Sequence, residues 1–267
     1  MPAVSVIMNC YNGEGYLRHA MDSVFAQTYV DWEIVFWDNA STDGSADVAR
    51  SYGPRVRYFR TATTSTLGVA RTLAAREARG RYLAVLDCDD VWLPEKLERQ
   101  VTRLEADPAL ALLYSDCWFI DAEGKRLGRA FHRTRPPAGD PFLGLLTRPN
   151  FIPCLTILMR RDVLEKIGWF HPSLRYTEEY DLVLRVARDY RIDFFEDPLA
   201  QYRLHGGNTT GTGSPETTRE VIGVIKETVS GLGLLSSRDR WAIRIRLFAL
   251  WCKLLTQYLK TAIQWPR

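Results

Sequence analysis

The chain has 267 residues, of which 46% are hydrophobic and 25% charged, as in globular proteins with a packed core, so disordered and fibrous classes are excluded. Its 35 basic and 32 acidic residues leave a net charge of +3, a balance too even to indicate a nucleic-acid partner.

The first 107 residues alternate short β-rich runs with helix-like segments, which predicts a parallel sheet covered by helices on both faces. Three of the runs are nearly continuous in apolar residues, as strands buried on both faces are. These runs are 4–9, 32–38 and 82–87. Ligands of such sheets bind outside the carboxyl ends of the strands, so we expect the polar residues that follow the three runs to lie together. A helix from Pro94 to about Asp107 closes this half.

The pattern changes in the second half. A strand-like run ends near Ile120, and a loop rich in Arg, Pro and Gly follows from Gly128 to Asp140, where we expect it to face an acceptor or to be mobile. A helix is predicted from about Glu178 to Asp189 and a strand at 192–196. We therefore divide a catalytic domain of residues 1–213 into a donor half, 1–107, and an acceptor half, 108–213, and assign residues 214–267 to a helical C-terminal tail.

The tail combines apolar and aromatic residues with basic ones, which predicts a helix that rests in the headgroup region of a membrane. The alternative is a helix that packs on the catalytic domain and exposes a basic face. The residues concerned are Trp241, Leu247, Phe248, Trp251 and Trp265, mixed with Arg240, Arg244, Arg246, Lys253 and Lys260.

The sequence LDCDD places Asp87 and Asp89 at the end of a buried strand. Carboxylates are costly to bury without a partner, and Mg²⁺ or Mn²⁺ is a suitable one, because such ions bind one or two carboxylates together with substrate phosphates. The pattern therefore predicts a site for a metal and a diphosphate. The alternative is that Asp89 or Asp90 caps the helix that opens at Pro94.

Asp38 ends the second apolar run, in the sequence WDNASTDGS. A carboxylate at this place can accept hydrogen bonds from a base N–H group or a ribose hydroxyl, so we expect Asp38 to contact a nucleoside. Ser41 or Asp43 can instead serve as a helix N-cap, a role that these residue types often fill.

Two segments resemble the large family of inverting glycosyltransferases, family 2, that includes many bacterial polysaccharide-building enzymes. They read MNCYNGEGYLRHAMDSVFAQTYVDWEIVFWDNASTDGS and GVARTLAAREARGRYLAVLDCDDVWLPEKL. The resemblance covers about the first 105 residues and resumes at GWFHPSLRYTEEYDLVLRVA and YRLHGGN. It implies a GT-A type α/β fold, a Rossmann-like mixed sheet flanked by helices, that binds a nucleoside-diphosphate sugar.

The resemblance also implies residue roles on the donor side. It places Cys10, Tyr11 and Asn12 near the base, Asp38 at the nucleoside and Arg71 near the nucleotide. A solvated helix arginine is the structural alternative for Arg71.

For the diphosphate end, the resemblance makes Asp89 the residue closest to the metal, and Asp87 a ligand of the ribose or the metal. His205 matches a position close to the diphosphate or the metal, where a neutral imidazole can complete the coordination shell. A purely structural role is the alternative for His205. Thr72 stands where the family often has Asn, so no donor contact is carried over to it.

The sequence TEEYDL opens the predicted helix at 178–189, and in the family an acidic pair there supplies the catalytic base, usually with Asp second. This chain has Glu179 instead, so either Glu178 or Glu179 is the base. We expect Glu179 to be the base and Glu178 to turn away, because successive helical residues point about 100° apart. The alternative is structural: first-turn acids complement the helix dipole, and Asp181 can pair with Arg185.

These features predict a transferase that moves a sugar, with inversion, from a nucleoside-diphosphate sugar to a hydroxyl of a glycan or lipid-linked acceptor, in cell-surface polysaccharide or glycolipid synthesis. Mg²⁺ or Mn²⁺ is the expected cofactor. One alternative is a silent sugar-nucleotide-binding or scaffold protein, which the intact acidic motifs disfavour. Another is a nucleotidyltransferase, for which the sequence has no Gly-rich basic triphosphate loop.

The expected location is cytoplasmic, with peripheral contact at the inner face of the membrane if the tail binds lipid. Five scattered cysteines without a C-x-x-C pair indicate reduced thiols rather than a disulfide framework or zinc site. The N-terminal residues do not resemble a secretory signal, and no run reaches the ~18 uncharged apolar residues of a spanning helix.

Overall fold

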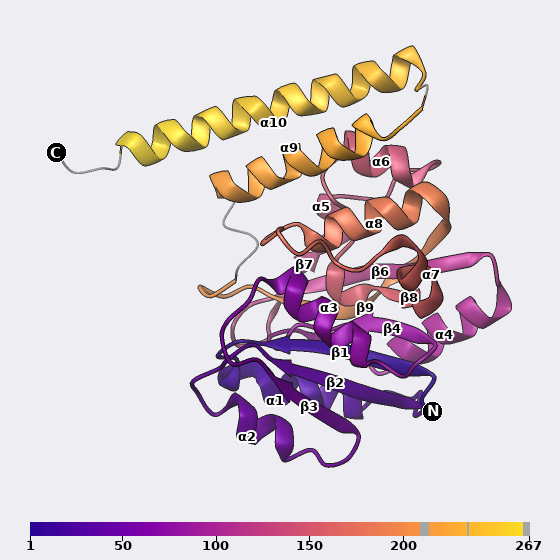
Figure 1. The fold of residues 1–267 in the computed structure, drawn as a ribbon, viewed down its shortest axis with the longest axis vertical. Helices are drawn as coiled ribbons and strands as arrows, with labels where there is room; N and C mark the ends of the chain where they lie inside the picture. Colours follow the sequence, from indigo (N-terminus) through magenta and orange to yellow (C-terminus); the bar gives the residue numbers. More distant parts are fainter. Residues whose placement is uncertain (209–213, 234, 264–267) are drawn as a thin grey trace.

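A computed structural model describes residues 1–208, 214–233 and 235–263, with side chains up to residue 259. One mixed sheet runs through the domain in the order β3-β2-β1-β4-β8-β6-β9-β5, and β7 pairs with β6 (Figure 1). The strands are β1 Val4–Cys10, β2 Trp32–Asp38, β3 Val56–Arg60, β4 Tyr82–Val85, β5 Val91–Trp92, β6 Leu110–Ile120, β7 Arg126–Arg129, β8 Leu158–Arg160 and β9 Arg191–Arg203.

Helices cover both faces of this sheet (Figure 1). They are α1 Glu14–Phe25, α2 Ser45–Arg50, α3 Leu67–Glu77, α4 Lys96–Ala106, α5 Ala130–Arg133, α6 Pro141–Thr147, the 3₁₀ turn η1 Cys154–Thr156, α7 Arg161–Ile167, α8 Glu178–Asp189, α9 Pro215–Ser230 and α10 Ser237–Ile263.

The mixed α/β sheet expected from the sequence is confirmed. Strands β1 to β4 are parallel, because each connection returns through a helix or loop to the same strand direction. Strand β8 then runs antiparallel to both β4 and β6, and β9 runs parallel to β6. This change of direction places the second half of the chain beside β4, across from β2 and β3.

Two apolar cores lie on the two faces of the sheet. Along β1, Val4, Val6 and Met8 pack against α1, α2 and α4, while Ile7 faces the larger core beneath α3 and α8. The alternation has the two-residue period of a strand, and both faces are apolar because both are covered. The continuous apolar runs in the sequence have this origin.

Three predicted boundaries were wrong in detail. The helix expected from Pro94 begins at Lys96. The loop expected from Gly128 to Asp140 contains the end of β7 and the short helix α5. The run predicted at 192–196 belongs to one long strand, β9, because its residues pair continuously with β6 apart from local bulges.

The C-terminal helices form a hairpin at the edge of the molecule farthest from β1 to β3 (Figure 1). Helix α10 packs against α9 and α6. Within the described ranges, no helix combines the length and apolar content needed to cross a bilayer. Trp265 and the side chain of Lys260, both part of the predicted membrane-binding segment, lie outside the described residues.

Candidate active site

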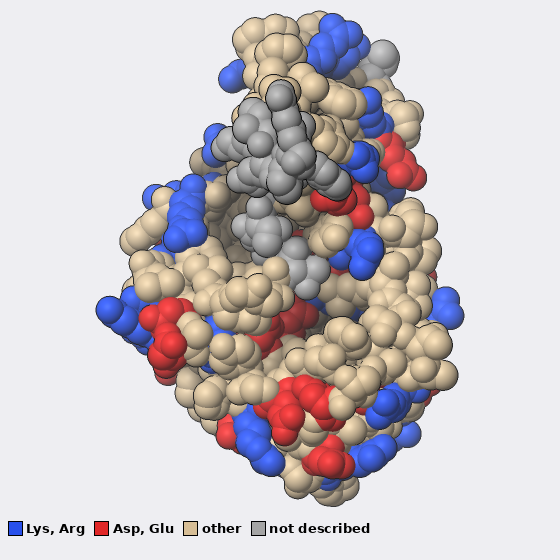
Figure 2. All heavy atoms as spheres, turned by 90° about the vertical axis from the view of Figure 1, so that its left-hand side faces the viewer, with Lys and Arg blue, Asp and Glu red and all other residues tan. Residues whose placement is uncertain are grey.

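A cleft of about 1080 Å³ opens at the carboxyl edge of the sheet, where the connections from β1 and β4 diverge. Figure 2 looks onto this edge and shows a hollow with acidic side chains near its centre. The cleft lining brings together nearly all the predicted site residues. These are Cys10, Tyr11, Asn12, Arg71, Asp87, Asp89, Glu178, Glu179 and His205.

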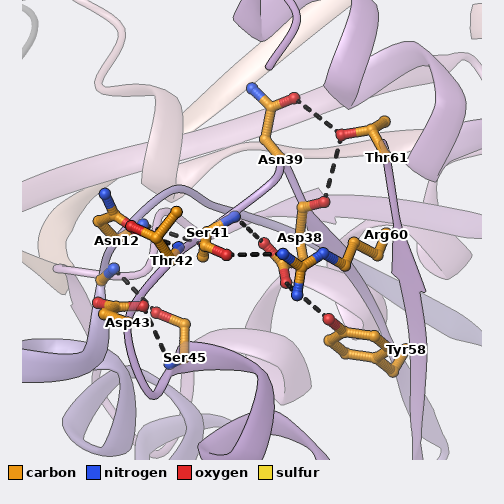
Figure 3. A network of polar contacts seen from close by, with 11 residues as sticks. Asn12, Asp38, Asn39, Ser41, Thr42, Asp43, Ser45, Tyr58, Arg60 and Thr61 are labelled. Carbon is orange, nitrogen blue, oxygen red and sulfur yellow. Dashed lines mark hydrogen bonds and ion pairs between the residues drawn. The ribbon is translucent and has the colours of Figure 1, made fainter. Parts of the chain in front are cut away.

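The β1 end of the cleft is held by a network between two loops (Figure 3). Asn12 has a left-handed backbone with φ 52°, and its Oδ1 accepts from the Thr42 N–H at 2.8 Å. Ser41 accepts from the Asn12 N–H at 3.0 Å, and Asp43 accepts from the N–H groups of Glu14 and Ser45, each at 3.0 Å. Asp43 therefore joins two loops, and the cap residue of α2 is Gly44.

Gly13 allows close packing of two thiols on the cleft floor. A Cβ at this position would lie 2.6 Å from Cys88 Sγ and 2.8 Å from Cys10 Sγ. Any larger residue would therefore displace one of these side chains. The Cys88 thiol is the main influence that lowers the pKa of Cys10.

Asp38 is fully buried and does not line the cleft. Its carboxylate accepts from Tyr58 Oη at 2.6 Å and from the Ser41 N–H at 2.7 Å, and Arg60 lies 3.6 Å away (Figure 3). Both oxygens are thus occupied by groups that shape the loop after β2. A direct contact between Asp38 and a nucleoside stays a prediction.

Two asparagines to which the sequence motifs gave no individual role also line the cleft. Asn39 accepts from the Ser65 N–H and donates to the Ser65 carbonyl, both at 2.9 Å, which ties β2 to the loop before α3. Asn9 is buried, and neither amide atom has a hydrogen-bond partner among the described residues. Its amide therefore remains available to a ligand. Each is the polar residue at or after the end of an apolar run, so the expectation that such residues lie together at one edge covers both.

The aspartates after β4 are positioned by the pairing of β5 with β9. Arg203, at the end of β9, donates its backbone N–H to Asp90 at 2.8 Å and its Nε–H to the Asp89 carbonyl at 2.9 Å. Burial raises the pKa of Asp90 well above its usual range. Helix α4 has no side-chain cap, so the alternative in which Asp89 or Asp90 caps it is wrong.

His205 lies against Asp89, with 2.9 Å between Nε2 and Oδ2. Its Nδ1 accepts from the Gly207 N–H at 3.1 Å, so Nε2 carries the proton and donates to Asp89. The Tyr16 ring packs on the imidazole at a centroid distance of 4.9 Å. Burial, followed by the charge of Asp87, raises the pKa of Asp89.

Arg71 joins the two groups of acids. Its guanidinium is only 2% exposed and contacts Glu178 Oε1 at 2.5 Å and Asp87 Oδ1 at 2.6 Å. The alternative of a solvated helix arginine is therefore wrong. A Cβ at Gly68, one turn before Arg71, would lie 2.3 Å from the His171 carbonyl, so a glycine is needed for α3 to approach the segment before α8.

Glu178 and Glu179 both line the cleft, so the expectation that Glu178 turns away was wrong. Glu178 is buried and bound to Arg71, and burial raises its pKa although Arg71 opposes the shift. Glu179 makes no side-chain hydrogen bond to a described residue. Burial and the neighbouring Glu178 raise its pKa to about 8. The pair of Asp181 with Arg185, at 2.8 Å, was predicted correctly.

Comparison with known proteins identifies the family of the chain. Residues 5–168 match the family described as glycosyl transferase family 2. The chain belongs to this family. An uncharacterized glycosyltransferase of Rickettsia prowazekii, RP339, is 33% identical over 214 residues, which are 79% of this chain and 67% of the relative. The putative teichuronic acid biosynthesis glycosyltransferase TuaG of Bacillus subtilis is 29% identical over 207 residues, 76% of this chain and 79% of the relative.

Solved structures agree on the GT-A type fold. The mannosyltransferase PcManGT of Pyrobaculum calidifontis, determined with GDP-Man and Mn²⁺, superimposes with a TM-score of 0.69 at 17% identity, covering 100% of this chain and 76% of that chain. At this identity the likeness establishes the fold alone.

One further residue of the glycosyltransferase was missed because it lies in the tail. Glu220 of α9 accepts from the N–H groups of Arg175 and Tyr176, at 3.0 and 2.9 Å, and from the Thr177 hydroxyl at 3.1 Å. These donors immediately precede Glu178. The tail helix therefore fixes the start of α8, a link that no local sequence pattern indicates.

Proposed function

We propose that this glycosyltransferase moves a sugar from a nucleoside-diphosphate sugar to an acceptor hydroxyl with inversion at the anomeric carbon. The observation that carries the proposal is the Arg71 bridge, which holds a diphosphate-side aspartate and a base-side glutamate in one cleft. Cys10, Tyr11 and Asn12 border the nucleoside end, and the Asn9 amide supplies free hydrogen-bonding groups there. In this proposal Asp38 acts through the loop it shapes.

A divalent cation, Mg²⁺ or Mn²⁺, fits the donor set at Asp87 and Asp89. Asp87 Oδ2 and Asp89 Oδ1 make no hydrogen bond to another residue that the structure describes, and hard oxygen ligands suit these ions. No cluster of three or more His, Cys, Asp or Glu side chains suited to a metal occurs in the described residues, so the diphosphate would complete the shell. When bound, the cation offsets the charge that grows on the leaving diphosphate.

His205 orients Asp89 for this task. Its Nε2–H holds Oδ2 and leaves the other carboxylate oxygen free. Direct ligation by Nε2 would require the imidazole proton to move to Nδ1 and the Gly207 N–H to turn away. A metal-ligand role for His205 would thus lose two hydrogen bonds, one to Asp89 and one from the Gly207 N–H, whereas the orienting role keeps both.

Glu179 is the general base in this proposal. It removes the proton from the acceptor hydroxyl as the oxygen attacks the anomeric carbon on the face opposite the diphosphate. Its unpaired carboxylate and raised pKa suit proton acceptance, whereas Glu178 is engaged by Arg71. The similarity to TuaG favours a glycan or lipid-linked acceptor of cell-surface polysaccharide synthesis.

The test is release of nucleoside diphosphate from a panel of UDP- and GDP-sugars, with Mn²⁺ or with a chelator, for the parent and Asp89→Asn. We expect Mn²⁺-dependent release for one donor class and its loss in Asp89→Asn. Donor binding without turnover would indicate a silent binding protein. Consumption of a nucleoside triphosphate and a sugar phosphate, with release of pyrophosphate, would indicate a nucleotidyltransferase. Either result overturns the proposal.

A further inference from the structure

Helix α10 carries two apolar stripes on opposite sides. The inner stripe consists of Ile243, Leu247 and Leu250, which join the large core beneath α6 and α9, and of Leu254, which is buried. The outer stripe lies at intervals of four and three residues and is exposed. It consists of Trp241 (67% exposed), Ile245 (46%), Phe248 (71%), Cys252, Leu255 (60%) and Leu259 (63%).

The spacing makes the outer stripe straight and continuous. At about 100° per residue, its six members fall within roughly 40° of one line along the helix, and the inner stripe is centred about 150° away. Single exposed apolar residues are ordinary on protein surfaces, but a contiguous row marks an interaction surface. Since α10 lies on the outer side of α9, nothing in the described residues covers this row (Figure 1).

The charges beside the stripe are almost all positive. Between residues 237 and 259 the helix has five basic residues and one acidic residue. Arg238, Arg240, Arg244 and Lys253 are exposed, whereas the single acid, Asp239, is hydrogen-bonded to Ser236 at the helix start. The partner must therefore offer an apolar interior bordered by negative charge.

We propose that the outer stripe of α10 rests in the headgroup and upper acyl region of an anionic lipid surface, with the helix parallel to the membrane. A helix with Trp, Phe and Leu on one side and Arg and Lys beside it has the chemistry of interfacial binding. The arginines and lysine then lie at the depth of the lipid phosphates, and long basic side chains reach that level easily.

A second copy of the chain is a poorer occupant. The intervals of four and three also suit a coiled coil, in which flanking charges of opposite sign pair between helices. Here a second α10 would bring Arg240 and Arg244 again and no carboxylate for them, so like charges would meet. Charge therefore favours lipid over self-association.

The position of α10 is compatible with binding of this helix to a membrane while the cleft stays accessible. Its C-terminal end points to the same side of the molecule as the carboxyl ends of β1 and β2 (Figure 1). A lipid surface along α10 would thus lie beside the edge on which the cleft opens. The inference does not depend on the donor chemistry proposed above.

The test is sedimentation of the full chain with vesicles of phosphatidylcholine alone or mixed with phosphatidylglycerol, at low and high salt. The variant is Trp241→Ser/Phe248→Ser/Leu255→Ser. The matched control, Val30→Ser/Leu127→Ser, removes apolar side chains that are 66% and 51% exposed away from α10. We expect binding of the parent and the control to anionic vesicles, weakened by salt, and a loss of roughly tenfold or more in the variant.

Equal partition of parent and variant would overturn the proposal, as would failure of the parent to sediment with anionic vesicles at low salt. A parent that is dimeric by light scattering and becomes monomeric in the variant would instead assign the stripe to a second copy. Unchanged donor hydrolysis and unchanged circular dichroism in the variant show that a loss of sedimentation is not a loss of folding.

Discussion

The cleft contains two pairs of acids whose environments differ. Asp87 and Asp89 follow a strand end, and their side chains are 31% and 24% exposed. Glu178 and Glu179 begin a helix, where Glu178 is 1% exposed and the pKa of Glu179 is raised to about 8. Carboxylates open to the cleft suit a cation and a diphosphate, whereas a carboxylate whose pKa is raised to about 8 suits proton transfer. The comparison teaches that surroundings, rather than residue type, divide the work.

The sharpest way to break this comparison is to neutralise one member of each pair. Glu179→Gln should lower turnover by about 10³-fold, because general base catalysis contributes about 10²–10⁴-fold, and should leave donor affinity unchanged. Glu178→Gln should lose much less. Single-turnover transfer and donor titration by calorimetry measure the two properties. The opposite ranking of the two variants would make Glu178 the base.

Substitution of Arg71 tests how much its bridge between Asp87 and Glu178 contributes to stability. Arg71→Met leaves Glu178 buried without a cation, which should lower the free energy of unfolding by about 3–5 kcal/mol. The control is Arg81→Met, which removes a surface pair with Glu105 and should cost at most about 1 kcal/mol. Urea unfolding at neutral pH measures both. Equal costs would mean that the bridge contributes no more than a surface pair.

The pH profile sharpens the role of Glu179. Its ionised form accepts the proton and is lost as pH falls through about 8. Below that value kcat/KM for the acceptor should fall about tenfold per pH unit. The same limb should be missing from the residual activity of Glu179→Gln. A parent profile that is flat between roughly pH 6 and 9 would contradict the assignment.

The titration of Glu179 should also change stability, but in the opposite direction: as pH rises, activity increases and the free energy of unfolding decreases. Since the folded-state pKa of Glu179 is raised above the usual carboxyl value, the folded protein holds a proton that the unfolded chain has released, and stability falls as pH rises toward about 8. Glu179→Gln mimics the protonated form. Its melting temperature should equal that of the parent at acidic pH and exceed it at alkaline pH. A constant difference across pH would place the raised pKa in doubt.

The smallest expected effect concerns the tail. Glu220→Gln keeps the shape of the side chain but weakens its hold on the segment before α8. A charged hydrogen bond contributes about 1.5–3 kcal/mol, and its partial loss should reduce turnover several-fold through Glu179 without changing donor affinity. Glu216→Gln, in the first turn of the same helix, is the control. Parental turnover in Glu220→Gln would mean that the tail does not influence the active site.

Much of the structure of residues 1–107 could be predicted from the sequence. Buried parallel strands need apolar residues on both faces, so the runs ending near Asn9, Asp38 and Asp87 were visible, and the ends of such strands meet at one edge. The family motifs then indicated nine residues that line the cleft. These signals are local in the chain, which is why a pattern of a few residues could reveal them.

What only the tertiary structure decided depends on contacts between distant residues. The sequence could not show that Arg71 reaches Glu178, 107 positions away, or that Arg203 holds Asp90, 113 positions away. Nor could it show that the Asp38 carboxylate accepts a hydrogen bond from Tyr58. The same holds for the tail. Its apolar residues are visible in the sequence, but which of them are buried depends on where α9 and α6 contact α10. The hydrophobic pattern of a segment predicts its secondary structure, whereas packing decides the partners of polar groups that are distant in the chain.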